Sequence, residues 1–134
     1  MGIVENVDRI RYNIAKSAKK AGREPSDVEL LAVTKTVRAD IMEQLLGAGV
    51  FKVGENRVQE LIEKFDVLGN KFEWHLIGRL QSNKIKYILN KVKLVHSLST
   101  LSAAAEMDRL CGSHGVDMDC LIQDSITGEE SKSG

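Results

Sequence analysis

The residues best suited to chemistry are polar side chains that follow short apolar runs. Lys35 comes one threonine after the apolar run Leu30–Val33. An ammonium group that emerges from a buried strand is partly desolvated, which lowers its pKa and favours the neutral amine. A neutral amine is the nucleophile that forms a Schiff base with a carbonyl carbon. From position alone, two plainer roles stay open: Lys35 reaches solvent, or it pairs with a carboxylate such as that of Glu55.

Other polar residues follow apolar runs in the same way. They are Gly54–Arg57, His75–Arg79, His96 with Ser97, and Gln123–Ser125. In parallel α/β proteins, ligands bind at the carboxyl ends of the strands. The sequence therefore predicts that any site is assembled from these segments.

Hydrophobic periodicity predicts the elements that carry these residues. Apolar spacings of three and four predict helices, and short β-branched runs predict strands buried on both faces. The helices are expected over 4–18 (ended by Gly22), 40–46 (capped by Asp40), 56–68, 84–92 (capped by Ser82 and Asn83) and 99–111 (ended by Gly112); the strands over 28–36, 50–53, 73–78, 93–98 and 118–126.

This alternation predicts right-handed βαβ units and a parallel sheet within one domain, residues 1–134. Such units fit either an open doubly wound sheet or part of an eight-stranded barrel. The length favours the open sheet, because a whole barrel takes about 250 residues. However, the chain ends right after its last strand, which suggests a fragment.

Composition excludes several classes of protein. The 134 residues carry 19 basic and 19 acidic side chains, which argues against a general nucleic-acid binder. The sequence has no apolar run of membrane-spanning length and no signal core, so neither a membrane protein nor a secreted one is expected. Cys111 and Cys120 do not form a disulfide framework, and a reducing, cytoplasmic setting is the default.

Familiar ligand motifs are also missing. The sequence contains neither a GxGxxG nor a GxxxxGK[ST] pattern, so dinucleotide and P-loop chemistry lack support. Cys111, His114 and Cys120 are conceivable metal ligands, but a fourth ligand is missing. A cysteine at a helix end and a histidine in a loop are the better interpretation.

Five motifs in order resemble the pyridoxal-phosphate homeostasis protein family, whose members are similar to the N-terminal barrel domain of alanine racemase. The motifs are LLAVTKT, VGENRVQE, WHLIGRLQSNK, VHSL and LIQxxIxGEESKSG. The resemblance runs from about Val4 to Gly134 and implies an α/β fold of the (β/α)₈ TIM-barrel type, here its first five strands with an N-terminal helix. It also implies pyridoxal 5′-phosphate as cofactor.

The resemblance assigns roles to individual residues. Lys35 matches the family lysine that holds the cofactor as a Schiff base. Asn56, His75 and Ser97 match positions that line the pocket, and Lys132 matches a lysine near its mouth. The family implies handling of the cofactor inside the cell, without established catalytic turnover.

Three departures from the family pattern modify this expectation. Members are about twice as long, so the phosphate cradle and the arginine that faces the pyridine nitrogen, which come from later strands, are missing here. Asp124 and Ser125 replace an apolar residue and asparagine, and Val37 replaces a frequent lysine. We therefore expect a chain truncated after its fifth strand, weak cofactor binding, and self-association through the open edges of the first and fifth strands.

Two other functions stay open. One is a racemase-like enzyme that uses Lys35 as anchor and base. It needs a second base on the opposite face of the cofactor, and neither Tyr12 nor Tyr87 is suitably placed. The other is a structural fragment that binds no cofactor and only self-associates.

Overall fold

The computed structural model describes residues 2–129. Their centre is one five-stranded sheet in which every neighbouring pair is parallel. The strands lie in the order in which they occur in the chain: β1 (Ala32–Val33), β2 (Lys52–Glu55), β3 (Glu73–Leu76), β4 (Val92–Leu98) and β5 (Asp119–Ile122). A doubly wound sheet reverses its strand order, so this arrangement overturns the interpretation that length favoured.

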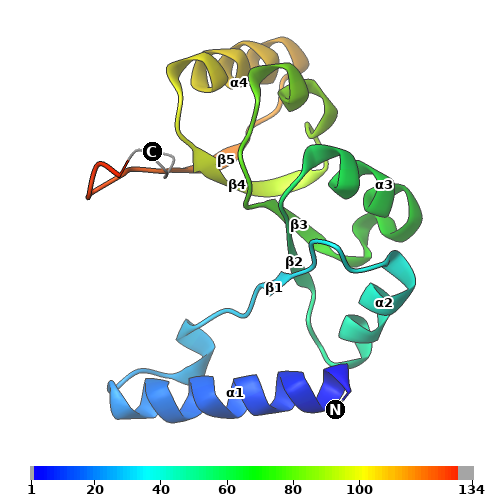
Figure 1. Ribbon diagram of the computed structural model, residues 1–134, viewed down its shortest axis with the longest axis vertical. Helices are drawn as coiled ribbons and strands as arrows, with labels where there is room; N and C mark the ends of the chain where they lie inside the picture. Colours follow the sequence, from blue (N-terminus) through cyan, green and yellow to red (C-terminus); the bar gives the residue numbers. More distant parts are fainter. Residues whose placement is uncertain (1, 130–134) are drawn as a thin grey trace.

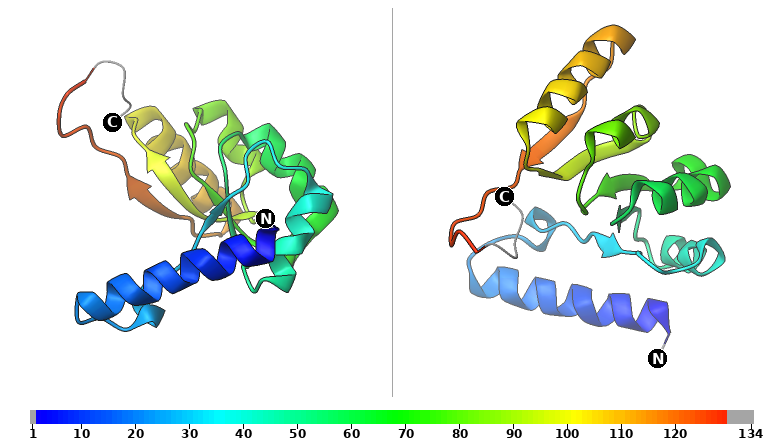
Figure 2. Two further views of the ribbon diagram at one scale, coloured as in Figure 1. Left: turned by 60° about the horizontal axis from the view of Figure 1, so that its bottom comes forward. Right: turned by 45° about the horizontal axis from the view of Figure 1, so that its top comes forward.

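The helices occupy one side of this sheet. α2 (Ala39–Gly47), α3 (Val58–Leu68), the 3₁₀ helix η3 (Ser82–Tyr87) and α4 (Leu101–His114) all lie on the same face (Figures 1 and 2). α1 (Ile3–Lys20) lies beyond the β1 edge and contacts α2. Short 3₁₀ helices η1 (Pro25–Asp27) and η2 (Gly69–Lys71) complete the described elements. We call the side under α2, α3, η3 and α4 the covered face and the other side the open face.

The hydrophobic core fills the space between the sheet and the helices. Met42 from α2, Leu61 from α3 and Ile85 from η3 are fully buried there. Trp74 of β3 packs its ring against Phe65 of α3, with the ring centroids 6.0 Å apart. Its indole nitrogen donates a hydrogen bond of 2.8 Å to the carbonyl of Gly69, which satisfies the one polar atom of this side chain.

The first strand is much shorter than predicted. Only Ala32 and Val33 pair with β2, and the backbone amide of Thr34 adds one hydrogen bond to Gly54. The prediction of a strand buried on both faces is also wrong, since Val33 is 52% exposed. Residues 28–36 lie at the edge of the sheet, where pairing is available on one side only and no described helix covers the open face.

The predicted helix over 84–92 is also wrong. The chain forms η3 instead, and Asn90 turns it with a positive φ of 65° before β4. Ile85, Ile88 and Leu89 still reach the core. The periodicity correctly identified the residues that are buried. However, apolar residues three or four positions apart lie on one face of either a 3₁₀ or an α-helix, so the spacing did not distinguish the two helix types.

Several predicted boundaries move by a few residues. α2 begins at Ala39 with Arg38 at its N-cap, so Asp40 lies in the first turn rather than at the cap. α4 runs past Gly112 to a left-handed Gly115, and the hydroxyl of Thr100 caps its start. β5 ends at Ile122, which leaves Asp124 exposed beyond the strand and removes the expected cost of burying an acid.

Candidate functional site

Lys35 lies directly beyond the carboxyl end of β1, in the turn that leads to α2. Its side chain is exposed, so the predicted partial desolvation is wrong; β1 ends at Val33 and the turn carries Lys35 into solvent. The suggested pairing with Glu55 is also wrong, because that carboxylate binds Lys64. Within residues 2–129, no carboxylate lies within 4.0 Å of the Lys35 ammonium. The amine is therefore open to a ligand from outside.

The residue after Lys35 holds the turn in a strained conformation. Thr36 has a φ of 65°, which is unusual for a β-branched residue. Its backbone amide donates a hydrogen bond of 2.6 Å to Glu60 of α3, and its hydroxyl donates one of 2.5 Å to the carbonyl of Lys35. Hydrogen bonding to α3 thus anchors the turn that presents the lysine.

A charged cluster is buried on the covered face beneath this turn. The Lys64 ammonium of α3 lies 2.5 Å from Glu55 Oε1 and 2.7 Å from Glu60 Oε1, and it donates a hydrogen bond of 2.8 Å to the carbonyl of Thr34. The hydroxyl of Thr34 donates to the other oxygen of Glu55. Burial raises the pKa of Glu55, although Lys64 and Thr34 oppose that rise. The cluster ties the carboxyl ends of β1 and β2 to α3.

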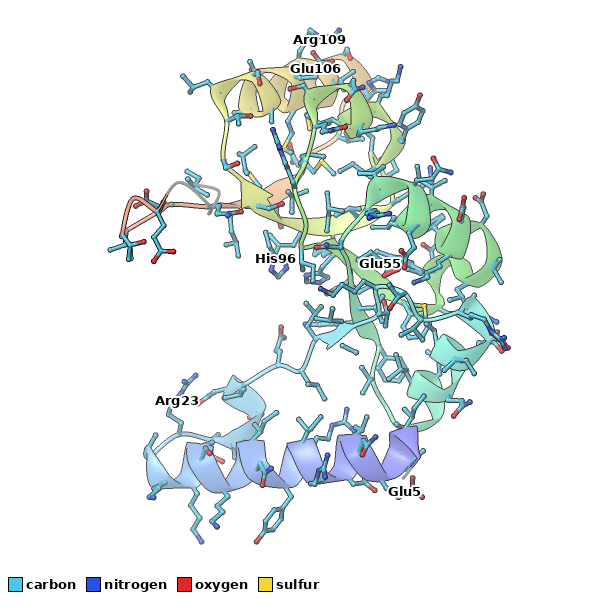
Figure 3. The ribbon with its side chains drawn as sticks, viewed as in Figure 1. Glu5, Arg23, Glu55, His96, Glu106 and Arg109 are labelled. Carbon is cyan, nitrogen blue, oxygen red and sulfur yellow. The ribbon has the colours of Figure 1, made fainter. Side chains whose placement is uncertain are left out.

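The open face carries a chain of charged and polar side chains from β2, β3 and β4 and from the segment that leads to β1. Glu29 lies 2.6 Å from the Lys52 ammonium of β2, which in turn lies 3.8 Å from Glu73 of β3. The ring of His75 bridges Glu73 and His96 of β4, with contacts of 2.8 Å at each of its nitrogens. Figure 3 shows that His96 points away from the helices, whereas Glu55 lies on the side of α3.

The two histidines share a single proton position between their rings. A carboxylate only accepts hydrogen bonds, so the His75 Nε2 that faces Glu73 carries a hydrogen. The other nitrogen of His75 either donates to His96 or accepts from it. Burial lowers the pKa of His96, and a charged His75 lowers it further, so His96 favours the neutral form. The pair of histidines, with Glu73 beside His75, can therefore hold a proton on the open face of the sheet.

The structure places three of the other four predicted site residues, Asn56, His75 and Ser97. Asn56 is exposed directly after β2, and its backbone lies so close to Gly78 that a Cβ at Gly78 would meet the Asn56 carbonyl oxygen at 2.0 Å. Ser97 is buried and donates its hydroxyl hydrogen to the carbonyl of Gly78. His75 belongs to the open-face chain, and Lys132 lies outside the described residues.

Sequence reasoning missed Lys64, Lys52 and Glu73. Lys64 falls three residues after Leu61 on the apolar stripe of α3, and it stands four residues after Glu60, the spacing of a helical ion pair. The position of Lys64 on this stripe could therefore have predicted a buried ion pair from the sequence. Nothing comparable marks Lys52 and Glu73, because only the parallel register of β2 and β3 places them opposite each other.

The two tyrosines considered as a second base lie on helical elements. Tyr12 is 67% exposed on α1, and Tyr87 lies on η3 with the ammonium groups of Lys84 and Lys86 at 5.9 and 5.1 Å from its ring centroid. Among residues 2–129, no group of three or more histidine, cysteine or acidic side chains is arranged to hold a metal ion. Over the same range, none of the helices combines the length and the apolar character that crossing a bilayer demands.

Comparison with known proteins adds a relationship to this geometry. No family model matches the chain. A pyridoxal phosphate homeostasis protein from Aquifex aeolicus is 38% identical over 135 residues, which cover 100% of this chain and 59% of the relative. The protein of the same name from Escherichia coli K12 is 36% identical, with 98% and 58% covered. The chain is thus related over its whole length to the pyridoxal phosphate homeostasis proteins. It spans about three-fifths of the length of these curated relatives.

Solved structures agree with the relationship. A crystal structure of a protein from Bifidobacterium adolescentis matches with a TM-score of 0.91 and 35% identity over 98% of this chain and 58% of that one. PipY from Synechococcus elongatus PCC7942, in a structure with pyridoxal phosphate bound, matches with a TM-score of 0.73 and 33% identity. That match covers 87% of this chain and 56% of PipY. The five-stranded sheet is thus part of a larger fold in these neighbours.

Proposed function

We propose that this protein binds pyridoxal 5′-phosphate and takes part in its homeostasis, with the cofactor held as a Schiff base on Lys35. The observation that carries the proposal is the free ammonium of Lys35 at the carboxyl edge of the sheet, in a turn anchored to α3 by Glu60. The family relationship and the pyridoxal phosphate found in PipY support the choice of ligand.

The bond-forming step needs only the lysine and the aldehyde. The neutral amine of Lys35 attacks the aldehyde carbon, a water molecule leaves, and a C=N bond forms. No carboxylate of the described residues lies within 4.0 Å of the Lys35 ammonium, so Lys35 breaks no ion pair when it loses its proton. Asn56, His75, Ser97 and Lys132 are proposed to line the pocket around this bond.

The test is a titration with pyridoxal phosphate followed by absorbance, then borohydride reduction and peptide mass mapping. The adduct is expected on Lys35 and should disappear in Lys35→Ala. Lys93→Ala, which removes an exposed lysine from β4, is the matched control and should keep the adduct. Labelling spread evenly over surface lysines, or unchanged in Lys35→Ala, would overturn the proposal.

We also propose that the sheet is a segment of a TIM-type barrel and that two copies associate in dilute solution. The described β1 and β5 each have a free edge, and Val33 and Leu121 are about half exposed. Apolar open faces and unpaired strands favour association. Size-exclusion chromatography with light scattering should report a dimer, and a monomer at all concentrations would contradict this.

The reduced cysteines Cys111 and Cys120 support a cytoplasmic location.

A further inference from the structure

A pocket of about 320 Å³ lies at the carboxyl ends of β2 and β3. It is formed where the chain leaves β2 for α3 and where it leaves β3 for η3. The lining residues come from these two connections and from the first turns of α3 and η3: Asn56, Arg57, Val58, Gln59, Arg79, Gln81 and Lys84.

The lining is cationic in a protein of zero net charge. Arg57, Arg79 and Lys84 contribute three positive charges, and none of the seven lining residues is acidic. Glu60, the next acid along α3, is occupied by Lys64 and by the backbone amide of Thr36. The positive charge of the pocket is therefore not neutralised by its own walls.

Apart from the exposed Arg9 of α1, the other arginines have partners among the described residues, whereas Arg57 and Arg79 have none. Arg38 is paired with Asp40 and Arg109 with Glu106, while Arg11 donates to the carbonyls of Ala48 and Gly49. Across residues 2–129, no acidic oxygen lies within 4.0 Å of Arg57 or Arg79, and neither guanidinium donates a hydrogen bond to the protein. Two unpaired guanidinium groups that line one pocket are ready to bind an anion.

We propose that this pocket binds a phosphate group, either free phosphate or a phosphate monoester. The guanidinium fork matches the spacing of phosphate oxygens, and Lys84 adds a third charge against a dianion. The amide side chains of Asn56 and Gln81 supply neutral donors, and Gln59 keeps one N–H beside the one that it donates to Glu63. Lys35 is not among the lining residues, so binding here does not depend on the Schiff base proposed above.

The test uses inorganic phosphate as the probe, at constant ionic strength held with chloride. The backbone amides of Arg57–Glu60 and the guanidinium NεH groups of Arg57 and Arg79 should show saturable NMR shifts. The double variant R57Q/R79Q should bind phosphate at least tenfold more weakly. The matched control R38Q/R109Q removes two exposed arginines that have their own acidic partners, and it should change affinity less than twofold.

Three results would overturn the proposal: shifts that grow linearly without saturation, shifts that map elsewhere, or equal weakening in the two double variants. If R57Q/R79Q loses its native spectrum, the single variants R79Q and K84Q make the same comparison, since Arg79 is exposed and Lys84 is only partly buried. Retained phosphate affinity in both would equally reject the site.

A second arm identifies the source of the phosphate group. In a Lys35→Ala background, pyridoxal phosphate should shift the same amides, whereas pyridoxal, which lacks the phosphate, should not. Shifts with inorganic phosphate alone would mean that the pocket accepts free phosphate but not this monoester. Because the background lacks Lys35, failure of the Schiff base and failure of this pocket give different results.

Discussion

The two faces of the sheet are built from alternate residues of the same strands, yet they differ in what holds them. On the covered face, Trp74 and Leu76 are buried under the helices, and even the charges of Glu55 and Lys64 are enclosed and paired. On the open face, Val33 is 52% exposed and the polar residues are linked mainly to one another, as His75 is to His96. Apolar packing against the helices therefore holds the side chains of the covered face in place, whereas hydrogen bonds between strands hold the polar side chains of the open face.

The largest expected effect comes from breaking the buried pair of the covered face. Lys64→Met leaves Glu55 buried without its cation, which should lower the free energy of unfolding by about 3–5 kcal/mol. The control Lys71→Met breaks an exposed pair with Glu43 and should cost about 0–1 kcal/mol. Urea unfolding of both variants measures the difference. Equal losses would mean that the Glu55–Lys64 pair is solvated like a surface pair.

A matched truncation on each face should have the next largest effect. Leu61→Ala empties a fully buried position of α3 and should cost about 2–5 kcal/mol. At protein concentrations where the chain is monomeric, Val33→Ala on the open face should change stability by no more than about 0.5 kcal/mol, since that side chain is already half in solvent. Thermal or urea unfolding checks both. A large loss in Val33→Ala would show that something covers the open face in solution.

The smallest expected effect is a pH dependence from the open face. The pKa of His96 is lowered in the folded protein, so the unfolded chain binds more protons once the pH drops below the ordinary histidine value of about 6.5. This contribution to stability should be complete above that pH and should be lost as the pH falls through the lowered pKa. His75 contacts the His96 ring directly, and Glu73 contacts the other nitrogen of His75.

The measurement is the free energy of unfolding between pH 7.5 and 5, compared between wild type and His96→Gln. The variant should show a shallower loss of stability on acidification. An identical slope in the two proteins would assign the acid sensitivity to other groups, with His75 and His114 as the remaining histidines.

Much of the covered face could be predicted from the sequence. Leu61 and Ile85 fall on apolar spacings, and both are fully buried. The site was predicted less well. Lys35 was correctly placed at the end of a strand, but its burial was not, because the extent of β1 depends on how many partners the strand has. The contact between His75 and His96 depends on the register of β3 and β4, which includes an irregularity after Trp74.

What the sequence by itself determined is local: which segments alternate between strand and helix, which side chains turn toward the core, and which polar residues stand at strand ends. These follow from periodicity and from the chemistry of each residue. Only the tertiary structure decided the sequential strand order, the enclosure of Glu55 with Lys64, and the gathering of Arg57, Arg79 and Lys84 around one pocket. Such contacts join residues distant along the chain, and their partners are chosen by sheet register and helix packing, which no local pattern encodes.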